Sequence, residues 1–378
     1  MRILHTSDWH LGRTFFGVDQ HANQSRFLDF LVDTATDRQV DAVLVSGDVY
    51  DRAIPNPEAM ELFDDAVGRL LAAGVRLVVS SGNHDSFVRL GVGRRQFDSV
   101  GLHIRTRLSD ITWPVPLPSA ELPEIVVYGI PYLEPGLVHS RFGVERTHTA
   151  VLGWAMEQVR HHAGTHFPGL PLVVMAHAFV GGGEGSESER DIGIGGVGIA
   201  PASVFAGTAY TALGHLHKPQ AITPTVRYSG SPVPYSFSEA TVDKMMFLVD
   251  FLGAVPVVDT IAIPRFTRVE TVRGPIADVL ARAVDYADAL TAVELTDEQR
   301  TENALGKLKE AYPGLLRLTY SNAPSLGPIR QSTPAQLAAR TDSEVFTEFI
   351  ADVTGRPAEP GQVARFESAL AAARRENA

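Results

Sequence analysis

The sequence predicts an α/β protein built as a sandwich of β-structure and helices, followed by a small α/β domain and further helices. Three observations indicate this fold. Apolar, strand-like runs alternate with helical patterns over about the first 250 residues, polar residues cluster where those runs end, and the segments between about residues 263 and 321 suggest a small separate α/β domain. Apolar strands that alternate with helices imply a largely parallel sheet with helices on its outside.

The strand-like runs consist mostly of Val, Ile, Leu, Met and Ala. Between the first two of them, Phe27, Leu28 and Leu31 recur at helical spacing, and further helices are expected near 57–73 and 147–163. Periodicity therefore supports regular alternation of the two element types. The predicted strands lie in RILHTS, DAVLVSGD, VRLVVSSGNHD, EIVVYGIP, PLVVMAHA, AYTALGHLH and MMFLVDF.

Changes in composition divide the chain into four segments. Residues 1–262 are expected to form the main domain, and residues 263–322 a small α/β domain. Residues 323–333, rich in Pro and Ser, are expected to form a linker. Residues 334–378 carry two helical stretches separated by GRPAEP.

Composition excludes several classes of protein. The 378 residues include no Cys, so a metal would have to be held by His, Asp, Glu or Asn. No stretch reaches the ~18 apolar residues of a membrane span, and the polar start argues against a secretory signal, so we expect a cytoplasmic protein. The net charge of −11 argues against a broad basic surface for nucleic acid, although it leaves room for a local site.

Five polar clusters follow separate predicted strands: SDWH, SGDVYD, SGNHD, MAHA and GHLH. Each cluster alone is weak evidence for a metal site, because a single His at the end of a strand more often has a structural role than a role as a ligand. Together they converge on one edge of the predicted sheet, which is where open α/β sheets bind ligands. The candidate metal ligands are Asp8, His10, Asp48, Asn83, His177, His215 and His217.

These ligand types indicate a particular chemistry. Carboxylates, one amide and several imidazoles suit Mn²⁺, Fe²⁺ or Zn²⁺. Seven ligands are too many for one ion with open positions, but they suit two ions that share a carboxylate, the arrangement used for phosphoryl transfer. Two divalent cations would leave the pocket locally positive, so an anionic phosphodiester is attracted despite the acidic chain.

His84 differs from the other imidazoles because it directly follows Asn83, and adjacent side chains on an extended segment point opposite ways. If Asn83 is a ligand, His84 is left to donate a proton to a leaving oxygen. Asp51 could orient that imidazole. A turn or capping role for Asp51 is nearly as well supported by its spacing.

Arginine and lysine side chains near the motif loops could contact phosphates, although such residues are more commonly solvated charges on the surface. The candidates are Arg13, Arg89 and Lys218. A loop with eight glycines, GGGEGSESERDIGIGGVG at 181–198, lies between two predicted strands. It is either a flexible linker or a functional loop, since a long connection inside a domain is often functional.

The motifs DWH, GD, GNHD, H and GHLH, in this order, resemble those of the calcineurin-like metallophosphoesterases. Longer stretches, MRILHTSDWHLG, GGGEGSESERDIGIG, ALGHLHKPQ and RYSGSPVPYSFSE, resemble the nuclease subunits of that superfamily that act in double-strand-break repair. The resemblance spans nearly the whole chain and is thinnest over 265–325. It implies a metallophosphoesterase domain with residues 263–322 as its capping domain.

For the site, the resemblance implies two metal ions bridged by Asp48 and a catalytic role for His84. Manganese would be the usual ion, with magnesium, zinc or iron as alternatives. At the position of Asp51, archaeal and eukaryotic counterparts carry His, whereas many phosphatases of the superfamily carry Asp. The implied ligands are Asp8, His10, Asp48 and His217 for one ion, and Asp48, Asn83, His177 and His215 for the other.

The resemblance also implies an activity: a manganese-dependent 3′ to 5′ exonuclease on double-stranded DNA and an endonuclease at hairpins and blocked ends. Such subunits form dimers and work with an ATPase in DNA repair and recombination. A metallophosphoesterase acting on small phosphodiesters, nucleotides or phosphoproteins is the alternative, and a scaffold without chemistry is the third interpretation. The third is the weakest, because such a scaffold has no need of seven metal-binding residues.

The C-terminal helices carry an apolar stripe formed by Val345, Phe346, Phe349 and Ile350. The resemblance implies that these helices dock on the coiled-coil base of the ATPase partner. The alternative, equally supported by the residues alone, is that the stripe packs on its own neighbouring helix around Phe366.

Overall fold

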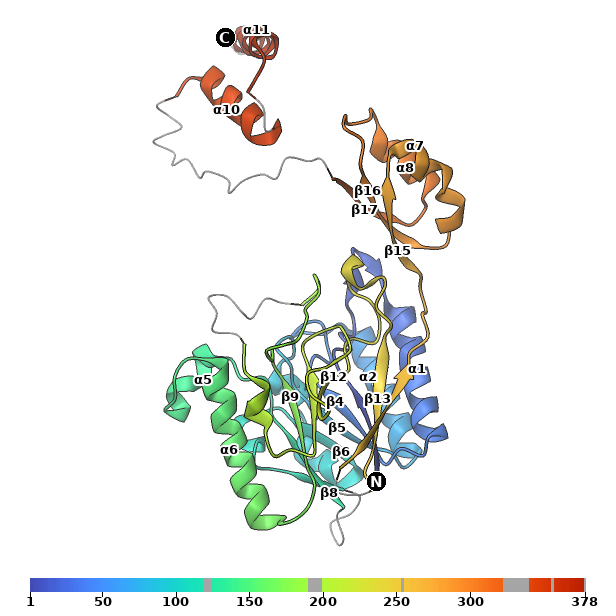
Figure 1. The fold of residues 1–378 in the computed structure, drawn as a ribbon, viewed down its shortest axis with the longest axis vertical. Coiled ribbons are helices and arrows are strands. Elements are labelled where there is room, and N and C mark those ends of the chain that lie inside the picture. The colour runs from blue at the N-terminus through green and yellow to red at the C-terminus, as the bar shows by residue number, and fades with distance from the viewer. Residues whose placement is uncertain (118–123, 190–198, 253–254, 322–339, 355–356, 377–378) are drawn as a thin grey trace. The chain divides into compact units, whose positions relative to one another are not determined.

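The structure, a computed structural model of the chain, divides into two compact units, Met1–Glu270 and Thr271–Ala378 (Figure 1). The expected linker at 323–333 lies outside the described residues, as do 334–339 and half of the glycine-rich loop. The described ranges are 1–117, 124–189, 199–252, 255–321, 340–354 and 357–376.

The first unit contains a six-stranded sheet with the order β14-β13-β1-β4-β5-β6. The strands β1, β4, β5 and β6 run parallel, while β13 is antiparallel to β1 and β14 is antiparallel to β13. The parallel strands are buried on both faces, which explains their continuous apolar sequences. Their bounds are β1 Arg2–Thr6, β4 Ala42–Ser46, β5 Arg76–Ser80, β6 Leu102–Arg105, β13 Met245–Asp250 and β14 Val257–Ala262.

A second six-stranded sheet has the order β11-β12-β10-β9-β8-β7. Here β8, β9, β10 and β12 run parallel, and the edge strands β7 and β11 are antiparallel to their neighbours. A separate two-stranded hairpin joins β2 and β3. The bounds are β2 Thr14–Phe15, β3 Val18–Asp19, β7 Val115–Leu117, β8 Ile125–Gly129, β9 Leu172–His177, β10 Tyr210–Gly214, β11 Gln220–Ala221 and β12 Val226–Tyr228.

The two sheets pack face to face with helices on their outer sides, so the expected sandwich of β-structure and helices is confirmed, although its division into two sheets was not predicted. The alternating pattern indicated one largely parallel sheet, whereas the structure divides the strands between two. The reason is that helices cover only one face of each sheet, so the other two faces bury each other. Between the sheets lie Ile3, Leu44 and Val78 from the first and Val127, Val173 and Met175 from the second, all completely buried.

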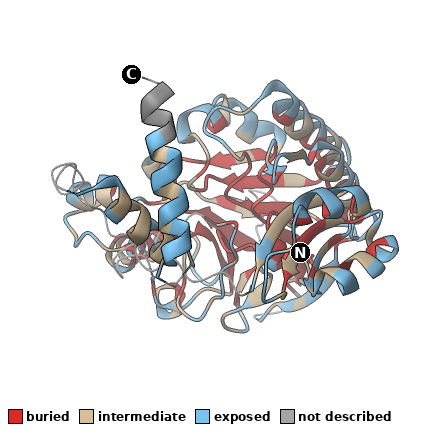
Figure 2. Ribbon diagram, turned by 90° about the horizontal axis from the view of Figure 1, so that it is seen from above, coloured by how far each residue is buried: buried red, intermediate tan, exposed pale blue. Residues whose placement is uncertain are grey.

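Helices cover the outer faces. The helices α1 (His21–Asp37) and α2 (Pro57–Ala72) pack on the first sheet, and α5 (Pro135–Phe142) and α6 (His148–His166) pack on the second. Figure 2 shows the strands buried and the outward helix surfaces exposed. Two short helices, α3 (Phe87–Leu90) and α4 (Arg94–Phe97), follow β5. Among the described residues, no helix has both the length and the apolar character needed to cross a bilayer.

The second unit begins with a small sheet in the order β15-β16-β17, in which β16 and β17 pair in parallel. Two helices pack on it around a core that includes Val279, Val293 and Leu308, each completely buried. The bounds are β15 Val269–Gly274, α7 Ile276–Ala281, β16 Leu290–Leu295, α8 Ala304–Ala311 and β17 Leu315–Tyr320.

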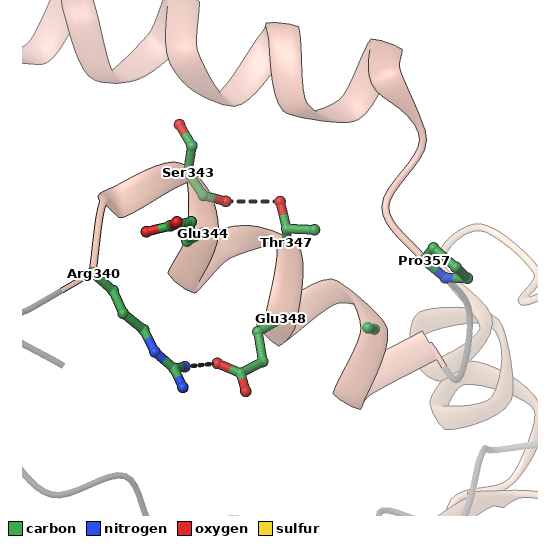
Figure 3. Close-up of a pocket in the computed structure, with 7 residues that line it drawn as sticks. Arg340, Ser343, Glu344, Thr347, Glu348 and Pro357 are labelled. Atoms are coloured by element: carbon green, nitrogen blue, oxygen red, sulfur yellow. Dashed lines mark hydrogen bonds and ion pairs between the residues drawn. The ribbon is translucent and has the colours of Figure 1, made fainter. Parts of the chain in front are cut away.

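Two C-terminal helices complete the chain, α10 (Asp342–Thr354) and α11 (Pro360–Glu376). The Phe346 ring stacks on Phe366 of α11, with centroids 4.2 Å apart, so this member of the apolar stripe packs on its own neighbour. Phe349 is 59% exposed. On another side of α10, Figure 3 shows a shallow hollow where Arg340 pairs with Glu348 and the Thr347 hydroxyl bonds the Ser343 carbonyl.

The close approach of the two sheets gives a test of the fold. A Cβ added at Gly214 would lie 1.9 Å from the Ser46 carbonyl oxygen, whereas one added at Gly153 in α6 meets nothing within 4 Å. Gly214→Ala is therefore expected to destabilise the protein by about 3 kcal/mol or more. Gly153→Ala is expected to stabilise it by about 0.5–1 kcal/mol. Thermal and denaturant unfolding measure both, and unchanged stability of Gly214→Ala would contradict this packing.

Candidate metal centre

The polar clusters follow strands of both sheets. Asp8 and His10 lie after β1, Asp48 after β4, and Asn83 and His84 after β5 of the first sheet. The other imidazoles come from the second sheet, where β9 ends at His177 and the loop after β10 carries His215 and His217. The carboxyl ends of parallel strands from two sheets therefore meet at one site, where the sequence predicted the edge of one sheet.

The loops that carry these residues adopt unusual backbone conformations. Asp8, His10 and Asp48 have φ angles of 53°, 45° and 49°, and His215 has a φ of 106°. Left-handed φ in non-glycine residues costs free energy and persists where surrounding contacts impose it. Here the backbone amides of Asp8 and His10 donate to the carbonyls of Gly47 and Asp48, at 3.1 and 2.9 Å. Neighbouring loops thus hold each other in place.

Three overlapping groups of side chains could each hold a metal ion: Asp8 with His10 and His217, His10 with Asp48 and His84, and Asp8 with Asp48 and His177. The ligand atoms within a group lie within 4.8 Å of one another. Asp48 and Asp8 each occur in two groups, which suits a pair of neighbouring ions. All members are buried.

Two expected ligands stand beside these groups. The Asn83 side-chain oxygen lies 2.9 Å from Nε2 of His177, which in turn is 3.4 Å from an Asp48 oxygen. The His215 ring lies 5.3 Å from the His177 ring, and its backbone amide donates to Asp8 at 2.9 Å. All seven residues expected to bind metal are thus gathered at this end of the two sheets.

Burial and contacts with one another change the pKa values of the carboxylates and imidazoles of the centre. Burial raises the pKa of Asp8 to about 6 against the opposing effect of His177. Burial would also raise the pKa of Asp48, but the imidazoles of His177 and His10 hold it well below its usual range. The pKa values of His10 and His215 are lowered by burial, which favours the neutral imidazole that binds metals.

His84 is held by backbone groups. Its amide donates to an Asp48 carboxylate oxygen at 2.9 Å, and its Nδ1 donates to the Asp51 carbonyl at 2.7 Å. The Asp51 carboxylate lies 3.9 Å from that nitrogen, beyond hydrogen-bond distance. The orienting group is therefore the Asp51 backbone, and not the side chain that the sequence suggested. The Asp51 carboxylate instead lies 3.6 Å from both His10 Nδ1 and Arg13 Nε.

The three cations proposed for phosphate contacts differ in position. Arg13 is closest to the centre, with its guanidinium 5.0 Å from the centre of the Tyr235 ring and its Nη2 donating to the Ser188 carbonyl at 2.6 Å. Its Nη1 is buried and has no hydrogen-bond partner among the described residues. Lys218 lies 3.9 Å from Glu184, and Arg89 is exposed on α3.

Sequence similarity to known proteins identifies the family. Residues 1–149 match the family model of calcineurin-like phosphoesterases, and residues 265–354 match a model described as the type 5 capsule protein repressor C-terminal domain. The SbcD subunit of the SbcCD nuclease of Escherichia coli is 34% identical over 302 residues, which cover 76% of this chain and 74% of that protein. The chain belongs to the SbcD nuclease family. The family resemblance and the metallophosphoesterase fold predicted from the motifs are confirmed.

A second SbcD relative, from Rhodobacter capsulatus, is 35% identical over 325 residues, covering 80% of this chain and 78% of that protein. Among solved structures, a dimetal phosphatase from Danio rerio matches 70% of this chain and 99% of its own, with 13% identity and a TM-score of 0.42.

The donor set of this SbcD-family chain fits divalent metal ions. Nε2 of His10 and Nε2 of His217 lie only 3.1 Å apart, a separation expected of two imidazoles that ligate the same ion. Nδ1 of His10 is buried without a hydrogen-bond partner among the described residues. Carboxylates, an amide and imidazoles without sulfur are typical of manganese, iron and zinc sites.

A buried network that was not predicted from the sequence fixes His217. Ser188, in the glycine-rich loop, donates its hydroxyl proton to Glu239 at 2.5 Å, so it must accept the proton of His217 Nδ1 at 2.6 Å. His217 Nε2 is then left without a proton and faces the centre. Lys244 pairs with Glu239 at 2.5 Å and also donates to the His217 carbonyl at 2.9 Å.

Two further carboxylates accept hydrogen bonds from backbone amides and so fix the loops around the centre. Glu189 accepts the His217 amide at 2.7 Å, so the described part of the glycine-rich loop serves the site and is not a linker. Asp85 accepts the amides of Val49, Tyr50 and Gly82 at 3.2, 3.0 and 2.9 Å and joins the loops after β4 and β5. The sequence feature that could have pointed to Ser188, Glu189, Glu239 and Asp85 is their position within the motif stretches GSESERDIG, SGSPVPYSFSE and GNHD.

Loss of the Ser188 contact is expected to weaken metal binding. Ser188→Ala removes the acceptor that fixes the His217 tautomer, so the affinity for Mn²⁺ should fall about 10-fold or more. Calorimetric titration of metal-depleted protein with MnCl₂ measures the change, with Ser140→Ala on exposed α5 as the control.

Glu239→Gln should act in the same direction and should also lower the melting temperature, because it leaves the buried Lys244 ammonium with a neutral partner. Wild-type Mn²⁺ affinity in both folded variants would show that the network does not position His217.

Proposed function

We propose that this chain is the nuclease subunit of an SbcCD-type complex and hydrolyses phosphodiester bonds at double-stranded DNA ends and hairpins. The convergence of carboxylates and imidazoles from both sheets into overlapping metal-binding groups carries this proposal. The family relatives, named as nuclease subunits, support the same reaction class. DNA repair and recombination in the cytoplasm is the corresponding cellular role.

In this proposal the residues of the centre would hold two divalent ions, most simply manganese. Such ions, when bound, would supply Lewis-acid stabilisation for the charge that develops on the phosphate. Asp48 would be shared by the two sets of ligands. One ion is assigned to Asp8, His10, Asp48 and His217, and the other to Asp48, Asn83, His177 and His215.

His84 is proposed as the general acid. Its Nδ1 proton is committed to the Asp51 carbonyl, so a proton on Nε2 is the one available for transfer to a leaving oxygen. The hydrogen bond that the His84 backbone amide donates to the Asp48 carboxylate fixes the position of His84 relative to the proposed bridging group. The same geometry brings His84 into one of the metal-binding groups, and a ligand role for it is the alternative.

Arg13 is the best placed of the proposed phosphate contacts, because its Nη1 is buried near the centre without a partner in the described part of the chain. Arg89 and Lys218 would contact phosphates farther away. A homodimer and an SbcC-like ATPase complete the proposed assembly. The C-terminal helices are the proposed ATPase contact, through Val345, Phe349 and Ile350, with Phe346 stacked on Phe366.

The alternative function, a phosphoesterase acting on small phosphodiesters, nucleotides or phosphoproteins, would use the same centre. It does not account for the second unit, which includes the helix pair at the C-terminus. The family assignment favours the nuclease as well.

A substrate comparison tests the proposed function. With Mn²⁺, the purified protein should cut linear duplex DNA and a DNA hairpin, and chelation with EDTA should abolish both activities. A small chromogenic phosphodiester serves as the second substrate. Hydrolysis of that ester without any cleavage of DNA would favour the alternative.

Substitution of His84 tests the general acid. His84→Ala should lower hydrolysis by about 10²–10⁴-fold, because the variant lacks the imidazole proposed to protonate the leaving oxygen. The variant should still bind two metal ions per chain by elemental analysis, whereas loss of an ion would assign His84 as a ligand. His161→Ala, on the exposed side of α6, is the control. An active His84→Ala enzyme would remove His84 from the mechanism.

Removal of residues 334–378 tests the partner contact. The truncated chain should no longer co-purify with the SbcC-like ATPase, while its Mn²⁺-dependent hydrolysis of the small ester persists. Phe349→Asp should weaken co-purification in the full chain, and Leu252→Asp, on the exposed surface of the first unit, should not. Undiminished co-purification of the truncated chain would count against this contact.

A further inference from the structure

A hollow of about 610 Å³ lies beside the metal centre in the first unit. Its walls come from the loops after β5, β6 and β8 and from helix α5. The volume falls within the range of about 300–1,000 Å³ that is typical of small-ligand sites. No function described so far uses this space.

The hollow adjoins the centre through one shared residue. Asn83, a proposed ligand, forms part of its wall together with Ser81 and Gly82. Tyr132 lines it as well, and its ring stands at 83° to the His177 ring with centroids 6.2 Å apart. The Tyr132 amide donates to the Ser81 carbonyl at 2.8 Å, which fixes the two walls to each other. A group bound in the hollow would thus adjoin whatever the metals hold.

The lining combines cations with aromatic and apolar surface. Arg107 and Arg141 both line the hollow, and Arg107 Nε is buried with no hydrogen-bond partner among the described residues. Phe87, 56% exposed, and Leu137, 79% exposed, add apolar surface beside Tyr132. Arginine with aromatic side chains is the combination that binds phosphates and stacks nucleobases.

The carboxylates of the lining are already engaged. Asp85 accepts three backbone amides. Glu134 accepts the Tyr132 hydroxyl at 3.0 Å and the Gly136 amide at 3.2 Å. Their negative charges are therefore partly offset by fixed donors, while the guanidinium of Arg141 has no ion pair within the described part of the chain. An anionic ligand is favoured over a cationic one.

We propose that this hollow binds the nucleotide next to the scissile phosphate of the DNA strand, with its base against Phe87 and Tyr132 and its other phosphate at Arg107 and Arg141. The inference rests on the proposed nuclease function and adds to it a subsite for the polymer. A small chromogenic phosphodiester or a phosphopeptide has no nucleobase and no neighbouring nucleotide phosphate at this distance. The hollow thereby distinguishes DNA from simple phosphate esters and phosphoproteins.

The test compares two substrates in the Mn²⁺-loaded full chain. Arg141→Gln should raise the KM for linear duplex DNA so that kcat/KM falls about 10-fold relative to that for a small chromogenic phosphodiester, which is the effect of losing one charge-assisted hydrogen bond. Arg107→Gln should act in the same direction, and Arg141→Lys should restore part of the loss. Arg146→Gln, an exposed arginine outside the hollow, removes the same charge and should leave the ratio unchanged.

The outcomes separate the subsite from the function. If wild-type protein cuts DNA and the Arg141 and Arg107 variants keep the wild-type ratio of kcat/KM values, the subsite is wrong and the nuclease stands. Equal losses on both substrates also overturn the subsite, because the arginines would then act on the centre itself. If wild-type protein hydrolyses only the small ester, both the nuclease and its nucleotide subsite are wrong. Melting temperatures of the variants check that each is folded.

Discussion

The contact between the two sheets at the carboxyl ends of β4, β9 and β10 is the constraint on which the whole site depends. The Ser46 hydroxyl donates to the Ala212 carbonyl at 2.9 Å, and Nδ1 of His177 donates to the Ser46 carbonyl at 3.1 Å. Gly214 lies so close to Ser46 that no side chain fits between them. Asp8, Asp48 and Asn83 come from one sheet and the imidazoles 177, 215 and 217 from the other. A separation of the sheets by even one side chain would therefore divide the ligands into two incomplete sets.

The site contains features that are unfavourable for folding, namely left-handed backbone conformations and buried charges. The left-handed conformations at Asp8, His10 and Asp48 are unfavourable, and each is retained by hydrogen bonds between loops. The Glu239–Lys244 pair is almost completely buried, and such pairs are weak contributors to stability in themselves. Their contacts run to the carbonyl of His217 and, through Ser188, to its imidazole, so the pair specifies the position of a proposed metal ligand.

The sequence predicted the strands, the covering helices and the positions of the polar clusters, because apolar runs and the polar residues that follow them can be recognised from residue type alone. It did not predict the division into two sheets, since the pairing partner of a strand depends on contacts between distant segments. Hydrogen bonds made by backbone groups could not be predicted either. The Asp51 carbonyl orients His84, and every residue type has such a carbonyl, so the residue type at this position does not indicate the contact. The Ser188, Glu239 and Lys244 network joins three separated segments, which spacing alone cannot bring together.

The acidic balance of the chain has a consequence for the proposed binding of DNA. With a net charge of −11, most of the surface repels a polyanion, so affinity has to come from a few local cations. Divalent ions at the centre would supply the largest of these charges, with Arg13 beside the centre and Arg107 and Arg141 in the adjoining hollow. A nuclease of this kind engages phosphates mainly where it can cut them. Under the proposed function, holding the rest of the duplex would fall to the ATPase partner, which is a physical reason for such a chain to work as one half of a complex.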